Sequence, residues 1–147
     1  MADVSARLVT FDKAEGGQIG EYVLNANDSM AMHVSLTNKA VGVIHATRFA
    51  SGHINDLRLQ IFGTLGGLDV QFKGGASRLR ASIGDDMLAG QWRDVATPEV
   101  STNYQKFIAA IRAGRGGSPD FARAAALQKV LDLAARSSAD GGRILAV

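Results

Sequence analysis

The side chains best suited to chemistry in this chain gather around one polar loop that joins two predicted strands. Arg48 stands at the end of the first strand, and His53 and Asn55 lie within the loop. A guanidinium, an imidazole and a carboxamide offer several hydrogen-bond donors and acceptors in a short space. Two roles remain open for them. Either they contact a ligand, or Gly52 and Asn55 shape a turn while Arg48 forms an ion pair with Asp56.

Metal chemistry has little support in the sequence. The chain has no cysteine, and its three histidines, His33, His45 and His53, have no ligand spacing with one another. His33 and His45 fall within predicted strands, where half-buried sheet residues are a simpler interpretation than ligands. We therefore expect no metal site.

Other polar or aromatic residues also have a structural explanation. Asp85 and Asp86 could form an acid/base pair, but beside a glycine they are typical of a solvated turn. Ser118 is expected to cap a helix, and no histidine near it in sequence would make it a nucleophile. Trp92 either anchors a sheet face in the core or contacts a second copy of the chain. We expect no catalytic residue among them.

The elements that must position the polar loop are antiparallel strands. Apolar and polar residues alternate with the period of two that is typical of a half-buried strand. In the strand that follows the loop, Leu57, Leu59 and Ile61 fall on the face expected to be buried. The predicted strands are 4–11, 29–36, 41–49, 56–62, 68–72 and 76–83, with a short edge strand at 91–95, and the polar loop is 50–55. They predict one open, mainly antiparallel sheet of about six or seven strands.

After Pro98 the apolar period changes from 2 to 3.6. Tyr104, Phe107, Ile108 and Ile111 form the stripe of an amphipathic helix. A second helix is expected to begin with Ser118 as N-cap and to stop at Gly141 and Gly142, before a short closing strand at 143–147. Its predicted apolar face comprises Phe121, Ala124, Ala125, Leu127, Val130, Leu131 and Ala134. Strands followed by helices indicate an α+β fold, with both helices on one face of the sheet.

Length and composition bound the class of protein. The chain has 147 residues and is 46% hydrophobic, which fits one globular domain over 1–147. No apolar run approaches the roughly 20 residues that a membrane helix needs, and the N-terminus does not resemble a secretory signal. The net charge is only +2 and the basic residues are scattered. We expect a cytoplasmic protein that binds neither membranes nor nucleic acid.

Two helices cannot cover both faces of a sheet this wide. Val9, Phe11, Ile44 and Phe62 indicate that neither face is uniformly polar. Exposed apolar faces usually mark contact surfaces. We therefore expect a homo-oligomer through the open sheet face, with a twofold dimer as the commonest arrangement.

Several segments, taken in order, resemble the C-terminal domain of the Gfo/Idh/MocA family, named after glucose-fructose oxidoreductase and inositol dehydrogenase. They are ATRFASGHINDLRLQIFGTLGGLDVQF, then Trp92, NYQKFIAAIRAG, and SPDFARAAALQKVLDLAARSSADGGRILAV. The resemblance implies an α+β domain that supports substrate binding and oligomerisation. Members are NAD(P)-dependent oxidoreductases that act mostly on sugars and cyclitols and pair this domain with a Rossmann domain.

Parts of the family pattern are absent from this chain. Its glycine clusters join two strands at 63–67 and two helices at 114–117, whereas a dinucleotide site needs a glycine turn between a strand and a helix. The family's Glu-Lys-Pro motif and its catalytic Asp and His pair are also missing. We expect this chain to bind no cofactor and to have no catalytic residue by itself. NAD or NADP is implied for a full-length parent or for a separate nucleotide-binding domain.

The resemblance gives the polar loop a role. His53, Asn55 and Arg48 occupy positions that border the substrate pocket in similar members, so we expect them to contact a sugar-like substrate. The chain would then be the substrate-binding and oligomerisation domain of an NAD(P)-dependent oxidoreductase. The alternative is a stand-alone, non-catalytic dimeric module that binds a small polyol or a protein partner.

Overall fold

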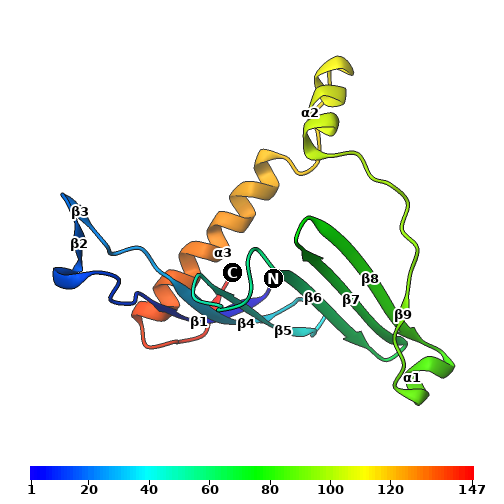
Figure 1. Cartoon of the computed structure of the whole chain (residues 1–147), viewed down its shortest axis with the longest axis horizontal. Helices are drawn as coiled ribbons and strands as arrows, with labels where there is room; N and C mark the ends of the chain where they lie inside the picture. The colour runs from blue at the N-terminus through cyan, green and yellow to red at the C-terminus, as the bar shows by residue number, and fades with distance from the viewer. The chain divides into compact units, whose positions relative to one another are not determined.

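The computed structural model describes residues 1–147 and confirms the predicted α+β class (Figure 1). One antiparallel sheet has the order β10-β1-β4-β5, and a second has the order β6-β7-β8-β9. The strands of the first sheet are β1 (Asp3–Val9), β4 (Ser29–Ser35), β5 (Val41–Thr47) and β10 (Leu145–Ala146). Those of the second are β6 (Leu57–Gly63), β7 (Gly66–Lys73), β8 (Ala76–Ile83) and β9 (Arg93–Asp94).

The remaining elements are short strands and helices. The two-residue strands β2 (Gln18–Ile19) and β3 (Tyr22–Val23) pair with each other after the 3₁₀ turn η1 (Glu15–Gly17). The helices are α1 (Asp85–Ala89), α2 (Asn103–Arg112) and α3 (Phe121–Ala139). None of them is long and apolar enough to cross a membrane.

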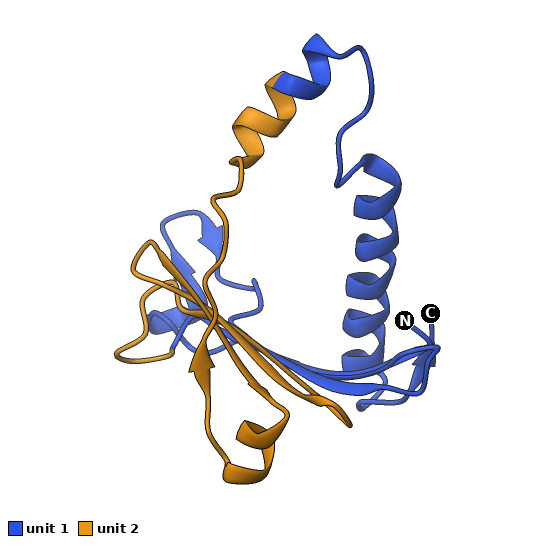
Figure 2. Ribbon diagram, turned by 90° about the vertical axis from the view of Figure 1, so that its right-hand side faces the viewer, with its two compact units in different colours: residues 1–49, 109–147 blue, residues 50–108 orange.

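The chain divides into two compact units (Figure 2). Unit 1 comprises Met1–Phe49 and Ala109–Val147, and unit 2 comprises Ala50–Ile108. The strands predicted for a single sheet are thus distributed over two sheets. β5 pairs with β4, whereas β6 pairs with β7.

Unit 1 buries the apolar rows that the alternation predicts. Val4 and Ala6 of β1 and Met32 and Val34 of β4 are buried, and α3 packs on β1. The helix contributes Val130, Leu133, Ala134 and Ser137 to this contact. This spacing of i, i+3, i+4 and i+7 places the four side chains on one face of the helix.

The details of α3 differ from the prediction. Its N-cap is Asp120, whose carboxylate accepts the Arg123 amide at 2.8 Å, and not Ser118. Only Val130 and Ala134 of the predicted apolar face are buried. The other five residues are exposed: Phe121, Ala124, Ala125, Leu127 and Leu131. The prediction also omitted Leu133 and Ser137, which are buried. The buried stripe is narrower and lies nearer the C-terminal end because α3 contacts the sheet only there.

Unit 2 has a sheet with one apolar and one charged face. Cross-strand pairing places Leu59 opposite Val70, and Val70 opposite Leu79. The prediction that Leu57, Leu59 and Ile61 are buried is wrong, because their exposed fractions are 62, 56 and 51%. No residue of α1 or α2 is buried, so neither helix covers this face.

The charged face of unit 2 contains Trp92, which is half-buried. Its ring lies so close to Gly67 that a Cβ on this glycine would be 2.8 Å from the ring. Phe62 packs edge-on against Trp92, and the guanidinium of Arg80 lies 5.7 Å from its ring centroid. These contacts support the first of the two roles predicted for Trp92, the anchor of a sheet face; they do not test a contact with a second copy.

The residues predicted as a solvated turn, Asp85 and Asp86, instead begin α1. The side chain of Asp86 accepts a hydrogen bond from Arg93 at 2.6 Å. Asp86 is thus engaged by Arg93, and both residues have a structural place in the first turn of α1.

Candidate functional site

The polar loop of unit 2 is a tight turn that displays His53. The His53 amide donates to the Ala50 carbonyl at 2.9 Å. Gly52 and Asn55 both have positive φ, 80° and 51°, in the region that glycine and asparagine tolerate best. The backbone conformation supports the turn-shaping role that the sequence offered for these two residues.

Asp56 organises the loop. Its carboxylate lies 2.9 Å from Nδ1 of His53, accepts a hydrogen bond from the side-chain amide of Gln71 at 3.2 Å and lies 3.4 Å from Nζ of Lys73. The Asp56 side chain is only 10% exposed, whereas that of His53 is 57% exposed. The hydrogen bond from His53, followed by that from Gln71, lowers the pKa of Asp56. The carboxylate therefore stays ionised at neutral pH and holds the imidazole at the surface.

Arg48 belongs to unit 1, where Asp28 organises the end of the sheet. The Arg48 amide donates to the Asp28 carbonyl at 2.9 Å. The buried Asp28 carboxylate accepts the Phe11 amide at 3.0 Å and lies 2.7 Å from Nζ of Lys13. These contacts lower the pKa of Asp28, with Lys13 as the largest cause. Within unit 2, Asp56 pairs with His53 and Lys73. The ion pair of Arg48 with Asp56 stays an alternative, because the two residues belong to different units.

Thus the structure places His53 and Asn55 together in one turn of unit 2, with Arg48 in unit 1. Gln71 and Lys73, which contact Asp56, were not among the residues predicted from the sequence. The alternation in β6 and β7 could have indicated them. Leu57 pairs with Phe72, and in an antiparallel pair this brings Lys73 beside Asp56.

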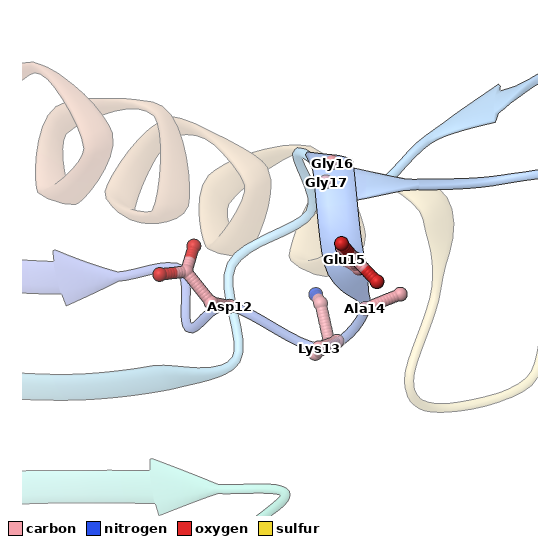
Figure 3. Close-up of a pocket in the computed structure, with 6 residues that line it drawn as sticks. All are labelled: Asp12, Lys13, Ala14, Glu15, Gly16 and Gly17. Carbon is pink, nitrogen blue, oxygen red and sulfur yellow. The ribbon is translucent and has the colours of Figure 1, made fainter.

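A separate hollow lies in unit 1 between β1 and β2 (Figure 3). It is lined by consecutive residues of one loop: Asp12, Lys13, Ala14, Glu15, Gly16 and Gly17. Its one cation, Lys13, is already paired with Asp28. The hollow therefore has a structural explanation, and we place the candidate site at the His53 loop. No three His, Asp or Glu side chains lie where they could hold a metal ion together.

Comparisons with known proteins identify the fold. No family model matches the chain, and no curated protein matches it. Among solved structures, levoglucosan dehydrogenase in complex with NADH has a TM-score of 0.80 and 23% identity. An oxidoreductase domain protein from Kribbella flavida has a TM-score of 0.76 and 22% identity, and an oxidoreductase from Thermotoga maritima has 0.66 and 20%.

The match extends over 99% of this chain but over only 44, 46 and 40% of these three structures. This chain therefore spans less than half of their length. At this identity the likeness concerns the fold alone. The chain has a fold that occurs as one part of these oxidoreductases.

Proposed function

We propose that this chain is the substrate-binding and oligomerisation domain of an NAD(P)-dependent oxidoreductase that acts on a sugar or cyclitol-like substrate. The observation that carries the proposal is the fold match over 99% of the chain with levoglucosan dehydrogenase, which was solved with NADH and levoglucosan. The resemblance to Gfo/Idh/MocA domains in the sequence supports the same assignment.

The chemistry of the polar loop also supports it. Sugars and cyclitols present many hydroxyl groups, each of which both donates and accepts hydrogen bonds. The exposed imidazole of His53 and the carboxamide of Asn55 provide both kinds of partner from one turn. In the proposed parent enzyme, Arg48 adds a guanidinium. Hydride transfer requires a nicotinamide, so the nucleotide-binding part of the parent would supply the redox chemistry.

Saturation-transfer NMR with levoglucosan and a panel of cyclitols tests the ligand assignment. We expect His53→Ala to weaken binding about tenfold or more, as loss of one well-placed hydrogen bond would. His33 and His45 are exposed on β4 and β5, so the prediction that they are half-buried is wrong. His45→Ala is the matched control, because His45 lies outside the loop. Equal binding by the His53 and His45 variants would remove the proposed site.

Two variants of Asn55 separate its turn role from a ligand contact. Asn55→Gly keeps the positive φ and removes the carboxamide, whereas Asn55→Ala also adds roughly 1 kcal/mol of backbone strain. Weaker binding in both variants supports a contact. Weaker binding in the alanine variant alone leaves Asn55 as a turn residue only.

A stand-alone module that binds a polyol or a protein partner is the second candidate. The exposed apolar face of β6, β7 and β8 favours it, since such a face suits a partner surface. Titration with NADH tests a premise that the two proposals share, namely that this chain alone does not bind the cofactor. Tight NADH binding by this chain alone would contradict both.

A further inference from the structure

We propose that Asp56 is a positioning residue that holds His53 in one tautomer, with Nδ1 protonated and Nε2 presented as an acceptor to a ligand hydroxyl. The identity of the ligand in this inference rests on the proposed function. The tautomer rests only on the geometry of the loop.

The tautomer follows from the pairing of the two side chains. Nδ1 of His53 lies 2.9 Å from Oδ2 of Asp56. An ionised carboxylate can only accept hydrogen bonds, so the ring nitrogen that faces it must carry the hydrogen. A neutral imidazole carries a single N–H. In this neutral form Nε2 is left with a free lone pair, on a side chain that is 57% exposed.

The carboxylate is itself held in place. Its other oxygen accepts a hydrogen bond from Gln71, and Lys73 lies on the same side as His53, 3.4 Å from Oδ2. Both residues come from β7, whose pairing with β6 fixes their position relative to Asp56. The three partners lower the pKa of Asp56, which keeps it ionised. Asp56 thus connects the His53 imidazole in the loop to two side chains of β7.

A fixed tautomer selects between ligand groups. A hydroxyl can donate to the lone pair on Nε2, whereas a carbonyl oxygen is an acceptor and meets that lone pair without a hydrogen. The loop should therefore bind the alcohol form of a ligand in preference to the ketone at this position. In an oxidoreductase, the same contact would favour the reduced substrate over the oxidised product.

Long-range proton–nitrogen NMR of the imidazole tests the tautomer directly. In the wild-type chain we expect the form with hydrogen on Nδ1 to exceed the other by about tenfold, as for a hydrogen bond to a charged group. Asp56→Asn should remove most of this excess, because a carboxamide can also donate and so accommodates either tautomer.

Asp85→Asn is the matched control, since it is the same substitution at an exposed aspartate without a histidine contact. His33 and His45 are internal references whose signals should not change. Hydrogen on Nε2 in the wild type, or an unchanged tautomer in the Asp56 variant, would overturn the inference. The wild-type spectrum decides this even if the variant is too unstable to measure.

The ligand preference is tested with myo-inositol and its 2-keto derivative, which differ only by oxidation of one hydroxyl. Stronger binding of the alcohol in the wild type, with the preference reduced in Asp56→Asn, supports the selection. A failure of both compounds and of levoglucosan to bind would count against the proposed function. It would leave the tautomer to be judged by NMR alone.

Discussion

At the scale of single residues, Asp69 of β7 is a buried carboxylate held by two guanidinium groups. Arg58 donates to both of its oxygens at 2.9 Å, and Arg80 donates to Oδ2. The Asp69 side chain is only 2% exposed. The hydrogen bonds from Arg58 first, and then from Arg80, lower the pKa of Asp69 to about 2. Three neighbouring strands of unit 2 are joined by this one carboxylate.

The lowered pKa of Asp69 predicts an acid-sensitive contribution to stability. Since the folded pKa lies below the unfolded value of about 4, the contribution is complete above pH 4 and is lost as the pH falls toward 2. Asp69→Asn should lower the urea midpoint at neutral pH and flatten the pH dependence between pH 4 and 2. Urea denaturation at several pH values measures both effects.

Asp94→Asn is the control for this prediction. Asp94 also accepts two hydrogen bonds from an arginine, Arg78, but its side chain is 64% exposed. Exposed ion pairs contribute little to stability, so the change should be small. An Asp69 variant as stable as the Asp94 variant would contradict the role assigned to the buried cluster.

The sequence predicted which side chains are candidates for ligand contact, but it did not predict their hydrogen-bond partners. His53 and Asn55 were identifiable because they are polar residues in a loop between two alternating segments. Their relation to Asp56 was not, because the pairing of Asp56 with Gln71 depends on the register of β6 against β7. Register is set by the whole hairpin, and alternation alone does not specify it.

At the scale of elements, α3 and β1 are joined by serine side chains as well as by apolar contacts. Ser137 is fully buried; its hydroxyl accepts the Ala6 amide at 2.9 Å and donates to the Arg143 carbonyl at 2.6 Å. Ser138 accepts the Leu8 amide at 2.9 Å. β10 pairs only with Asp3 and Val4 of β1. Beyond β10, the two serine hydroxyls therefore accept the hydrogen bonds of the β1 amides that have no strand partner on that edge.

Ser137→Ala should therefore destabilise unit 1. The substitution leaves the Ala6 amide and the Arg143 carbonyl without their partner, and a buried unsatisfied polar group costs about 1–3 kcal/mol. The free energy of unfolding from urea denaturation measures the loss. Ser101→Ala is the control, because Ser101 is exposed. A Ser137 variant within error of the control would show that water replaces the hydroxyl.

Element prediction succeeded where one periodic pattern decided the outcome. Strands β1, β4 and β8 lie within about two residues of their predicted bounds, since alternation over seven or eight residues identifies a half-buried strand. The buried stripe of α3 was less predictable. Its N-terminal half contains four alanines and also the apolar residues Phe121, Leu127 and Val130, so composition alone does not say which turn meets the sheet.

At the scale of the whole molecule, the largest departure from expectation is the apolar face of unit 2. Nine residues on β6, β7 and β8 share this face and none is charged: Leu57, Leu59, Ile61, Leu68, Val70, Phe72, Leu79, Ala81 and Ile83. Alternation correctly placed them on one side of the sheet. Alternation does not predict what covers these residues, because the covering surface is not part of the sheet.

We propose that a second copy of the chain covers this apolar face. Self-association through a sheet face was predicted from the sequence, but for the face that the helices leave open and not for the one that carries Leu59. Leu59→Lys then places a charge in the contact twice in a twofold dimer, and it should raise the dimer dissociation constant at least about tenfold. Sedimentation velocity over a range of concentrations measures the shift.

The adjacent variant Gln60→Lys is the matched control, since successive strand residues point to opposite faces and Gln60 lies on the charged side. Equal dissociation constants for the two variants would place the contact elsewhere. A wild-type chain that is monomeric at every concentration would remove self-association and leave the face to a different partner.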